Sequence, residues 1–373
     1  MLLLAGCQAS ALISIRPPLN PQGHSTSLPV AKIVPTLDPP QAEIPTPVLV
    51  HDSSSSSQGE SVSVQAPTPL SDPLRFVFPT PAPPPVSAWR PPLYPSPWAM
   101  SPYDHFYFAR PIAADEVNWP EADYRYGGVL FGDTVHTGVD IPVPKGTPVL
   151  AAGSGKVIWA GFGFYHGYYD PNDPYGIAVA IHHDFGYQGQ ELYTLYGHLD
   201  QVKVAVGQYV KTGDLLGLSG QTGNATGPHL HFEVRVGNND YFKTQNPELW
   251  LVPPQGWGVL AGRVLITSGL LAHGQDIVLT SKSTNQHWLA KTYGSNTVNS
   301  DAYYQENVVI SDLPAGSYVL HVPYFGFDYS LDIEIHPGLV NYFTFKGRYG
   351  YINAPPPTPT AQAPGSPAKI PSP

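Results

Sequence analysis

Short apolar runs, broken by glycines and turn residues, recur along the chain between about residue 103 and residue 253. No convincing 3.6-residue repeat accompanies them, so this stretch is predicted to form strands rather than helices. Two of the runs flank Gly153-Ser154-Gly155, a turn sequence that predicts a β-hairpin. The expected strands are residues 148–152, 156–160, 177–181, 191–198 and 229–236.

The pattern changes after residue 253, where another series of short runs is separated by turns. Within residues 331–335 apolar and polar side chains alternate, as in a half-buried strand. Such a series is typical of a small β-sandwich. The runs are residues 261–266, 276–280, 307–310, 317–322, 331–335 and 340–345. The hydrophobic pattern therefore predicts a mainly β chain with two domains, residues 96–253 and residues 255–351.

Composition separates both ends of the chain from this β-rich part. Of the 44 prolines among 373 residues, 21 fall in the first 100 residues and 8 in the last 19. Segments of this kind cannot bury enough apolar surface to fold. We expect a disordered tether over residues 8–95 and a disordered tail over residues 352–373.

Net charge narrows the classes of partner. The formal charge is -10, with only 18 Lys and Arg, whereas nucleic-acid binding requires clustered basic residues. No nucleic-acid partner is therefore expected. Internal apolar runs also stay short of the roughly 18 residues of a membrane span.

Cys7 is the only cysteine and follows Leu2-Leu3-Leu4-Ala5-Gly6. This sequence resembles the lipobox of bacterial lipoproteins, in which the cysteine is lipidated at the mature amino terminus. The resemblance implies that residues 1–7 are the remnant of a lipoprotein signal, although the segment before Cys7 is shorter than a full signal requires. It also implies an extracytoplasmic protein of the cell envelope, anchored to the membrane. The alternative is a chance cysteine in a disordered end.

The strand at residues 229–236 divides into two faces. Side chains alternate along a strand, so His229, His231, Glu233 and Arg235 project to one side while apolar residues project to the other. One face belongs to the core and the other carries titratable groups. Glu233 is expected to support the site or to form a salt bridge, not to bind a metal.

Two other clusters can complete the site. By the same alternation, Thr194, Tyr196 and His198 should share a face, and His198 reaches the pocket if the two strands are neighbours. His136 and Asp140 flank a glycine and precede a proline, which places them on a strand edge or loop. His182 and His183 have no companion cluster, so both are expected to be structural.

Two imidazoles and one carboxylate form a normal catalytic zinc set, with the fourth position left for water. The clusters supply such a set and leave two histidines for acid–base work. The residues alone thus predict a zinc-dependent hydrolase.

Four motifs, in this order and spacing, look like those of the lysostaphin-like zinc endopeptidases of bacterial cell walls. They are His-Thr-Gly-Val-Asp at 136–140, Pro-Lys-Gly-Thr-Pro-Val at 144–149, Tyr-Gly-His-Leu at 196–199 and Thr-Gly-Pro-His-Leu-His-Phe-Glu at 226–233. The resemblance covers roughly residues 105–250.

Position by position, the resemblance implies that His136, Asp140 and His231 bind one zinc ion and that His198 and His229 are the catalytic pair. It implies a compact antiparallel β fold of the duplicated hybrid motif type, with a narrow groove and peptidoglycan as substrate. His229, beside a ligand, is the more suitable base for water, and His198 would serve the oxyanion or the leaving amine. Their roles stay interchangeable from sequence.

Other segments bear on the groove and on the second domain. The aromatic stretch at 162–175 could form a lip of the groove or simply pack on itself. Residues 96–135 could cross the site, with Asp104, His105, Asp115, Glu116 and Asp133 as potential extra ligands. Residues 308–320 are similar to the carboxypeptidase regulatory-like, or prealbumin-like, family, and a wall-binding or spacing role is a hypothesis.

The leading hypothesis is a lipid-anchored zinc endopeptidase that hydrolyses peptide bonds of peptidoglycan. Two alternatives remain at this stage. The domain could be a non-catalytic wall-binding regulator of another hydrolase, with its groove blocked, or the chain could be a structural surface lipoprotein. The full set of histidines favours the enzyme over both.

Overall fold

A computed structural model describes residues 92–112, 122–130, 134–294 and 297–357. Cys7 and most of the two proline-rich ends lie outside these residues, as do Asp115, Glu116 and Asp133. Among the described residues no helix is long and apolar enough to cross a membrane.

The first part of the fold is built from eleven strands and three short 3-10 turns, η2 (Ala122–Tyr124), η3 (Tyr241–Lys243) and η4 (Pro247–Leu249). The strands are β1 (Val129–Leu130), β2 (Thr134–Val135), β3 (Val139–Pro142), β4 (Pro148–Leu150), β5 (Gly155–Phe162), β6 (Ile177–Tyr187), β7 (Gln190–Val202), β8 (Tyr209–Val210), β9 (Leu215–Ser219), β10 (His229–Val236) and β11 (Thr244–Gln245).

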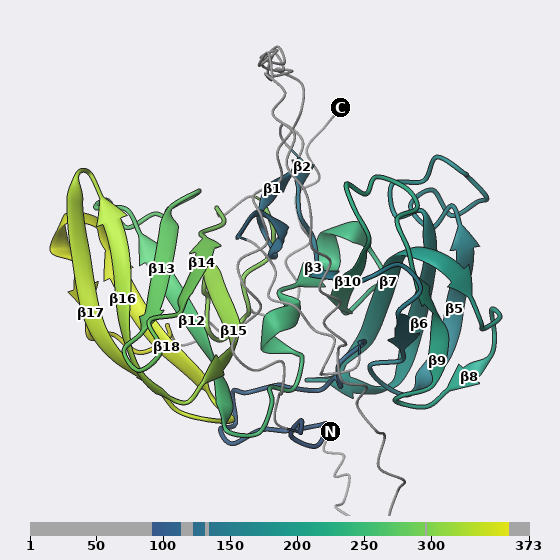
Figure 1. Ribbon diagram of the computed structural model, residues 1–373, viewed down its shortest axis with the longest axis horizontal. Helices are drawn as coiled ribbons and strands as arrows, with labels where there is room; N and C mark the ends of the chain where they lie inside the picture. Colours follow the sequence, from purple (N-terminus) through teal and green to yellow (C-terminus); the bar gives the residue numbers. More distant parts are fainter. Residues whose placement is uncertain (1–91, 113–121, 131–133, 295–296, 358–373) are drawn as a thin grey trace, which may run out of the picture. The chain divides into compact units, whose positions relative to one another are not determined.

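Nine of these strands form one antiparallel sheet, in the order β11-β10-β7-β6-β5-β8. β3 pairs with β10 on the edge of β10 that lies opposite β7. β9 pairs with both β4 and β7. Figure 1 shows β10, β7, β6 and β5 side by side in this order. The predicted neighbourhood of the two histidine-bearing strands is therefore confirmed.

The predicted hairpin around Gly153-Ser154-Gly155 is wrong. β4 pairs with β9 and β5 pairs with β6 and β8, so the two strands that flank the turn do not pair with each other. The backbone N–H groups before the turn bond elsewhere, Ala151 to the Asp214 carbonyl and Ala152 to the Tyr196 hydroxyl, both at 2.8 Å. These long-range bonds are invisible to a local turn signal.

The core of this part lies against one face of β10. Leu230, Phe232 and Val234 are fully buried in the main apolar cluster, together with Ile181 and Tyr196. The alternation expected for this strand is thus observed. It directs His229, His231, Glu233 and Arg235 to the opposite face.

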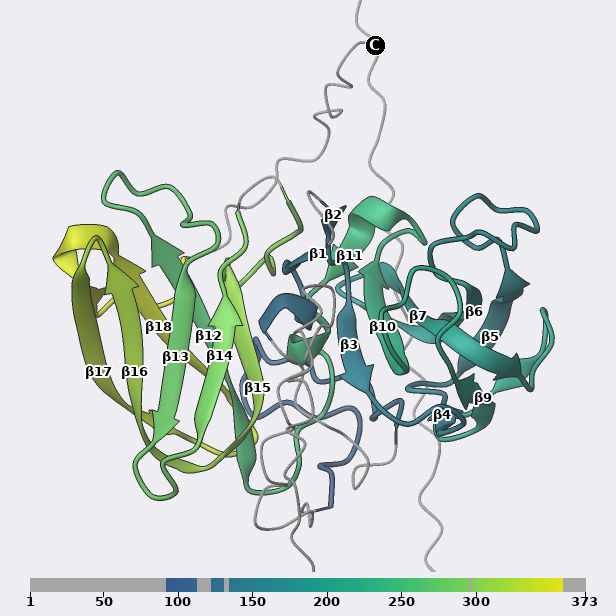
Figure 2. The ribbon, with the colours of Figure 1, turned by 45° about the horizontal axis from the view of Figure 1, so that its top comes forward.

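The second part contains β12 (Trp257–Leu265), β13 (Asp276–Ser281), β14 (His287–Lys291), β15 (Val308–Pro314), β16 (Gly316–Tyr324), β17 (Phe327–Ile335), β18 (Val340–Lys346), η5 (Gly347–Tyr349) and β19 (Tyr351–Ile352). They form two four-stranded sheets, β15-β12-β18-β19 and β14-β13-β16-β17. Figure 2 shows the strands of the second sheet side by side. A shared apolar core fills the space between the sheets, with Val264, Ile310 and Phe345 from one and Ile277 and Leu320 from the other.

The predicted fold class, mainly β with antiparallel sheets, is confirmed. Each of the six runs expected after residue 253 overlaps a strand, whereas β14 and β19 were missed. The expected alternation in β17 is also present, because Leu331 and Ile333 are partly covered while Asp332 and Glu334 are exposed.

Both parts belong to one compact unit and share apolar contacts. Val259 and Ala261 of β12, Val309 of β15 and Tyr304 belong to the same buried cluster as the core beneath β10. The second set of strands is thus packed against the first.

Candidate metal centre

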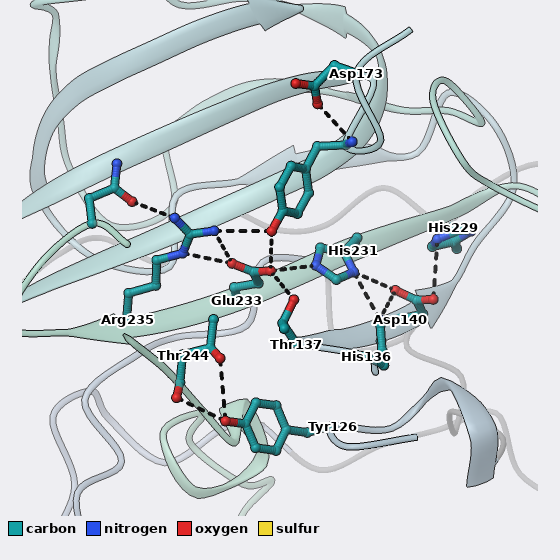
Figure 3. A network of polar contacts seen from close by, with 12 residues as sticks. Tyr126, His136, Thr137, Asp140, Asp173, His229, His231, Glu233, Arg235 and Thr244 are labelled. Carbon is teal, nitrogen blue, oxygen red and sulfur yellow. Dashed lines mark hydrogen bonds and ion pairs between the residues drawn. The ribbon is translucent and has the colours of Figure 1, made fainter. Parts of the chain in front are cut away.

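β10 brings the candidate site together because it pairs with strands on both sides. His231 lies opposite Asp140 of β3 and opposite Gly197 of β7. Directly opposed residues in an antiparallel pair project to the same face, so Asp140 and His231 point into one space. His136 joins them from the connection between β2 and β3 (Figure 3).

Three side-chain atoms meet at this place. His136 Nε2 lies 2.9 Å from Asp140 Oδ1 and 3.0 Å from His231 Nδ1, and His231 Nδ1 lies 2.9 Å from Asp140 Oδ1. All three residues are buried. Ligand atoms about 2.1 Å from zinc at tetrahedral angles are separated by about 3.4 Å, so a slight widening of the triangle gives one face of a zinc site.

The outer nitrogens of both imidazoles are also bound. His136 Nδ1 donates to the Arg125 carbonyl at 3.1 Å, and His231 Nε2 lies 3.1 Å from Glu233 Oε1. A carbonyl or carboxylate accepts a hydrogen, so these contacts hold the proton on the outer nitrogen and leave the inner one for a metal. The donor set and its supports both fit zinc.

Glu233 is the centre of a buried network around His231 (Figure 3). Its Oε1 accepts from the Thr137 hydroxyl at 2.6 Å and from the Tyr175 hydroxyl at 2.9 Å, and Oε2 pairs with Arg235 at 2.6 Å. Burial alone would raise the pKa of Glu233, but Arg235 and the hydrogen bond with His231 lower it to about 2. Glu233 therefore holds the His231 ring and forms a salt bridge with Arg235, in agreement with the sequence expectation of a supporting or ion-paired residue.

The electrostatics of the triangle favour a positive charge. Burial would raise the pKa of Asp140, but attraction to His136 and hydrogen bonds hold it well below the usual value. Burial also works against protonation of His231, yet hydrogen bonds with Asp140 and Glu233 raise its pKa to about 9. A dication held by these residues would take the place of such a proton, since metal ligands bind in their deprotonated forms.

His198 and His229 lie beside the triangle, with ring centroids 4.6 Å apart. Each donates Nδ1–H to a backbone carbonyl, His198 to Thr222 at 2.7 Å and His229 to Gly227 at 2.8 Å. In a neutral imidazole the other nitrogen then carries the lone pair. Burial, the largest cause, lowers the pKa of both rings, that of His198 to about 3. Both rings are therefore neutral, and each carries its lone pair on Nε2.

His198 reaches the site by a route that simple alternation does not give. Thr194 and Tyr196 do share a face, but it is the core face, where Tyr196 packs on Phe232 with ring centroids 5.4 Å apart. The expectation that His198 shares their face is wrong. Between the pairs Val179–Tyr196 and Ile177–Leu199, β7 has one extra residue. His198 has φ 59° there, and this bulge turns its ring toward the site.

Two glycines leave room for His231. A Cβ at Gly138 would lie 2.4 Å from the Phe232 carbonyl oxygen and 2.9 Å from the His231 ring, and a Cβ at Gly197 would lie 3.3 Å from His231 Cβ. Sequence reasoning used Gly138 only as a sign of irregular backbone. Its position between His136 and Asp140 was the available signal, whereas nothing local marked Thr137 or Tyr175 as supports of Glu233.

The triangle opens into a pocket of about 800 Å³. Tyr165 and Tyr175, from the aromatic segment at 162–175, line it together with Tyr241. The segment also packs on itself, since Phe164 meets Tyr175 edge-on at 5.6 Å. The segment therefore both lines the pocket and packs on itself, so the two interpretations are compatible.

The other titratable residues considered from sequence lie elsewhere. Asp104 accepts from the Tyr304 hydroxyl at 2.7 Å, and His105 lies 3.4 Å from Asp301, so neither adds a ligand. His183 bonds to Ser154 and Thr194 in the core, as its structural assignment predicts. Within the described residues, His136, Asp140 and His231 are the group with metal-binding spacing.

These features define a zinc metallopeptidase domain. Residues 134–244 match the sequence model of peptidase family M23, and this segment is a domain of that family. The match confirms the family resemblance of the four motifs. It includes all five histidine and aspartate positions of the site.

Several curated proteins are similar to part of this chain, and the name of one of them states an action on peptidoglycan. Lysostaphin of Staphylococcus simulans is 30% identical over 208 residues, which are 55% of this chain and 36% of that protein. Peptidoglycan DD-endopeptidase ShyB of Vibrio cholerae is 43% identical over 103 residues, 28% of this chain and 21% of that protein. The chain thus spans well under half the length of these relatives.

Among solved structures, the catalytic domain of lysostaphin from Staphylococcus simulans is 36% identical, with a TM-score of 0.29. The similarity covers 33% of this chain and 86% of that domain. A zinc-containing peptidase from Vibrio cholerae is 34% identical, with a TM-score of 0.28, over 36% of this chain and 37% of that one.

Proposed function

We propose that the protein is a zinc-dependent endopeptidase that hydrolyses peptide bonds of peptidoglycan. The observation that carries this proposal is the combination of a three-atom metal triangle with two further imidazoles whose Nε2 atoms accept protons. A purely structural zinc site uses four protein ligands and needs no adjacent bases. The names of two relatives, both peptidoglycan DD-endopeptidases, support the same substrate class.

In this proposal His136 Nε2, Asp140 Oδ1 and His231 Nδ1 hold the zinc ion, one per chain. When bound, zinc lowers the pKa of water and polarises the scissile carbonyl. Glu233 and the Arg125 carbonyl keep the two ligand rings in the required tautomer.

His229 is the proposed base. Its Nε2 is buried without a hydrogen-bond partner among the described residues and lies 3.4 Å from Asp140 Oδ2. It can accept a proton from water beside the ligands, and the Asp140 carboxylate stabilises the charge gained. Its Nδ1–H bond to the Gly227 carbonyl keeps the ring in position.

His198 is the proposed second helper. Its ring lies next to His229 and 5.7 Å from His231, and its Nε2 can take up a proton and return it to the leaving amine. The bond from its Nδ1 to the Thr222 carbonyl fixes the same tautomer.

The pocket lining suits a peptide without strong negative charge. None of the described residues that line it is Lys or Arg, and its walls carry the aromatic rings of Tyr165, Tyr175 and Tyr241. Such walls pack on small or apolar side chains and exclude water from the bond being cut.

We further propose that the protein works outside the cytoplasm, anchored by lipid at Cys7. The supports are the Leu-Ala-Gly-Cys sequence and the wall-directed names of the relatives. Replacement of Cys7 by Ser should release the protein from the membrane fraction. If the variant stays in the membrane fraction, the proposed lipid anchor is contradicted, but the proposed peptidase activity is not.

The activity is tested by measuring zinc content and then analysing purified peptidoglycan by mass spectrometry after incubation with the protein. We expect about one zinc per chain and new peptide ends, which should be absent with His229→Ala. Bound zinc with no new ends would contradict the enzyme and favour a non-catalytic wall regulator.

A further inference from the structure

One short segment, residues 125–128, connects the candidate metal centre to the second β domain. We call it the support segment. It bonds three times to His136: Gly127 N–H donates to the His136 carbonyl and His136 N–H to the Gly128 carbonyl, both at 2.8 Å, and His136 Nδ1 donates to the Arg125 carbonyl at 3.1 Å. The place and the tautomer of His136 therefore follow this segment.

The support segment has little structure of its own. It leads into β1, which among the described residues pairs only with β2, and each of these strands has two residues. A two-stranded ribbon of this length is not stable in water by itself. Contacts from elsewhere in the molecule must hold it.

Tyr293, which follows β14, supplies one of these contacts. Its ring meets Tyr126 edge-on at 5.5 Å, and a Cβ added at Gly127 would lie 2.5 Å from Tyr293 Cβ. Tyr126 is buried, and its hydroxyl accepts from the Asn299 N–H at 3.0 Å. The segment thus fits closely against residues of the second domain.

A buried ion pair adds a second connection. Arg125, whose carbonyl holds His136, pairs with Glu248. Glu248 Oε2 also accepts from the Ser311 N–H at 2.8 Å and from the Ser311 hydroxyl at 2.7 Å, and Ser311 belongs to β15. Breaking a buried pair of this kind is costly, so the link is strong.

We propose that the second β domain is a positioning element of the metal centre. Through Tyr293, Asn299 and Ser311 it holds the support segment, and the segment holds His136 so that its Nε2 faces Asp140 and His231. The inference rests on the proposed zinc centre and gives the second domain a role in zinc affinity. Tyr293 is a positioning residue and not a catalytic one, because it does not touch the metal triangle.

The test compares two tyrosine truncations in the full chain. Tyr293→Ala removes the ring against Gly127 and should weaken zinc binding by about 10- to 100-fold, the usual effect of losing a support of a metal ligand. Tyr318→Ala is the matched control, since Tyr318 is also buried, at 2% exposure against 1%, but lies in the core between the two sheets. Zinc affinity is measured by chelator competition, and the cobalt-substituted protein gives a ligand-field spectrum.

Tyr293→Phe keeps the ring and should keep both the zinc affinity and the cobalt spectrum. Equal zinc affinity in folded Tyr293→Ala, or an equal loss in Tyr318→Ala, would overturn the proposal. If Tyr293→Ala does not fold, Gly127→Ala disturbs the same contact from the other side, and unchanged zinc binding there would overturn it too. Failure of the unmodified chain to bind zinc would instead refute the proposed zinc centre.

Discussion

At the scale of single residues, the site depends on which nitrogen of each histidine carries the proton. His136 and His231 turn different nitrogens to the triangle, because one is held by a backbone carbonyl and the other by Glu233. His198 and His229 both give Nδ1–H to carbonyls. Four imidazoles thus have two distinct kinds of environment.

The first prediction separates these two groups. His229→Ala and His198→Ala should keep bound zinc and lose cleavage by roughly 100-fold or more, as expected for removal of a general base or acid. His231→Ala should lose both, because it removes a ligand. Zinc content and peptide release are measured on the same preparations. Full cleavage by either of the first two variants would contradict its catalytic role.

The second prediction concerns Glu233. Glu233→Gln should weaken zinc binding by about 10- to 100-fold, since the amide holds the His231 ring less firmly and leaves Arg235 without its carboxylate. Thr137→Val, which removes one hydrogen bond to the same carboxylate, should have a smaller effect. Chelator competition measures both, and equal affinity in Glu233→Gln and the unmodified protein would refute the support role.

At the scale of elements, the site requires β3, β10 and β7 in one register. The register places Asp140, His231 and Gly197 side by side, and the bulge in β7 then adds His198. A left-handed backbone at a residue other than glycine costs about 1–2 kcal/mol. Such strain is retained where surrounding structure enforces it, as it does next to the histidine pair.

The third prediction tests the close approach of β3 to β10. Gly138→Ala should abolish or strongly reduce zinc binding, because its Cβ would meet the Phe232 carbonyl and the His231 ring. Gly227→Ala is a stringent control, since it also lies near the site but its Cβ meets nothing within 4 Å. Similar zinc affinities for the two variants would show that the close approach of β3 to β10 at Gly138 does not limit zinc binding.

At the scale of the whole molecule, polar and charged side chains join the two sets of strands, some in the interior and some at the surface. Arg110 pairs with Asp312, and Lys291 Nζ lies 2.6 Å from Asp123 Oδ1. Near the same boundary Glu306 is fully buried and accepts hydrogen bonds from the Tyr293 hydroxyl and the Asp301 N–H. Burial, with repulsion from Asp301, raises its pKa to about 8.

The fourth prediction follows from that raised pKa. Between its ordinary value of 4.5 and about 8, Glu306 holds a proton in the folded state that the unfolded state has lost. The free energy of unfolding should therefore fall as pH rises through this window. Glu306→Gln keeps a neutral side chain and should flatten this dependence. Denaturant unfolding between pH 5 and 8 measures it, and identical slopes for the two proteins would contradict the shift.

How far sequence reasoning reaches differs among the residues of the site. His229 and His231 could be assigned to one face because β10 is regular and side chains alternate along it. His198 was assigned to the right pocket by an incorrect argument, since a bulge reverses the alternation. The hairpin at Gly153 failed because its neighbouring N–H groups bond to Asp214 and Tyr196, which are distant in the chain.

The sequence by itself determined three things. Alternation of apolar and polar residues predicted the strands, the residue types in the motifs supplied the donors, and the order of the motifs indicated the family. All three are properties that can be read along the chain. Only the tertiary structure decided which atoms meet. It brought Asp140 and His231 into register, placed Glu233 behind the His231 ring and the Arg125 carbonyl behind the His136 ring, and set Tyr293 against Gly127. Such contacts depend on strand pairing and domain packing, which no short stretch of sequence contains.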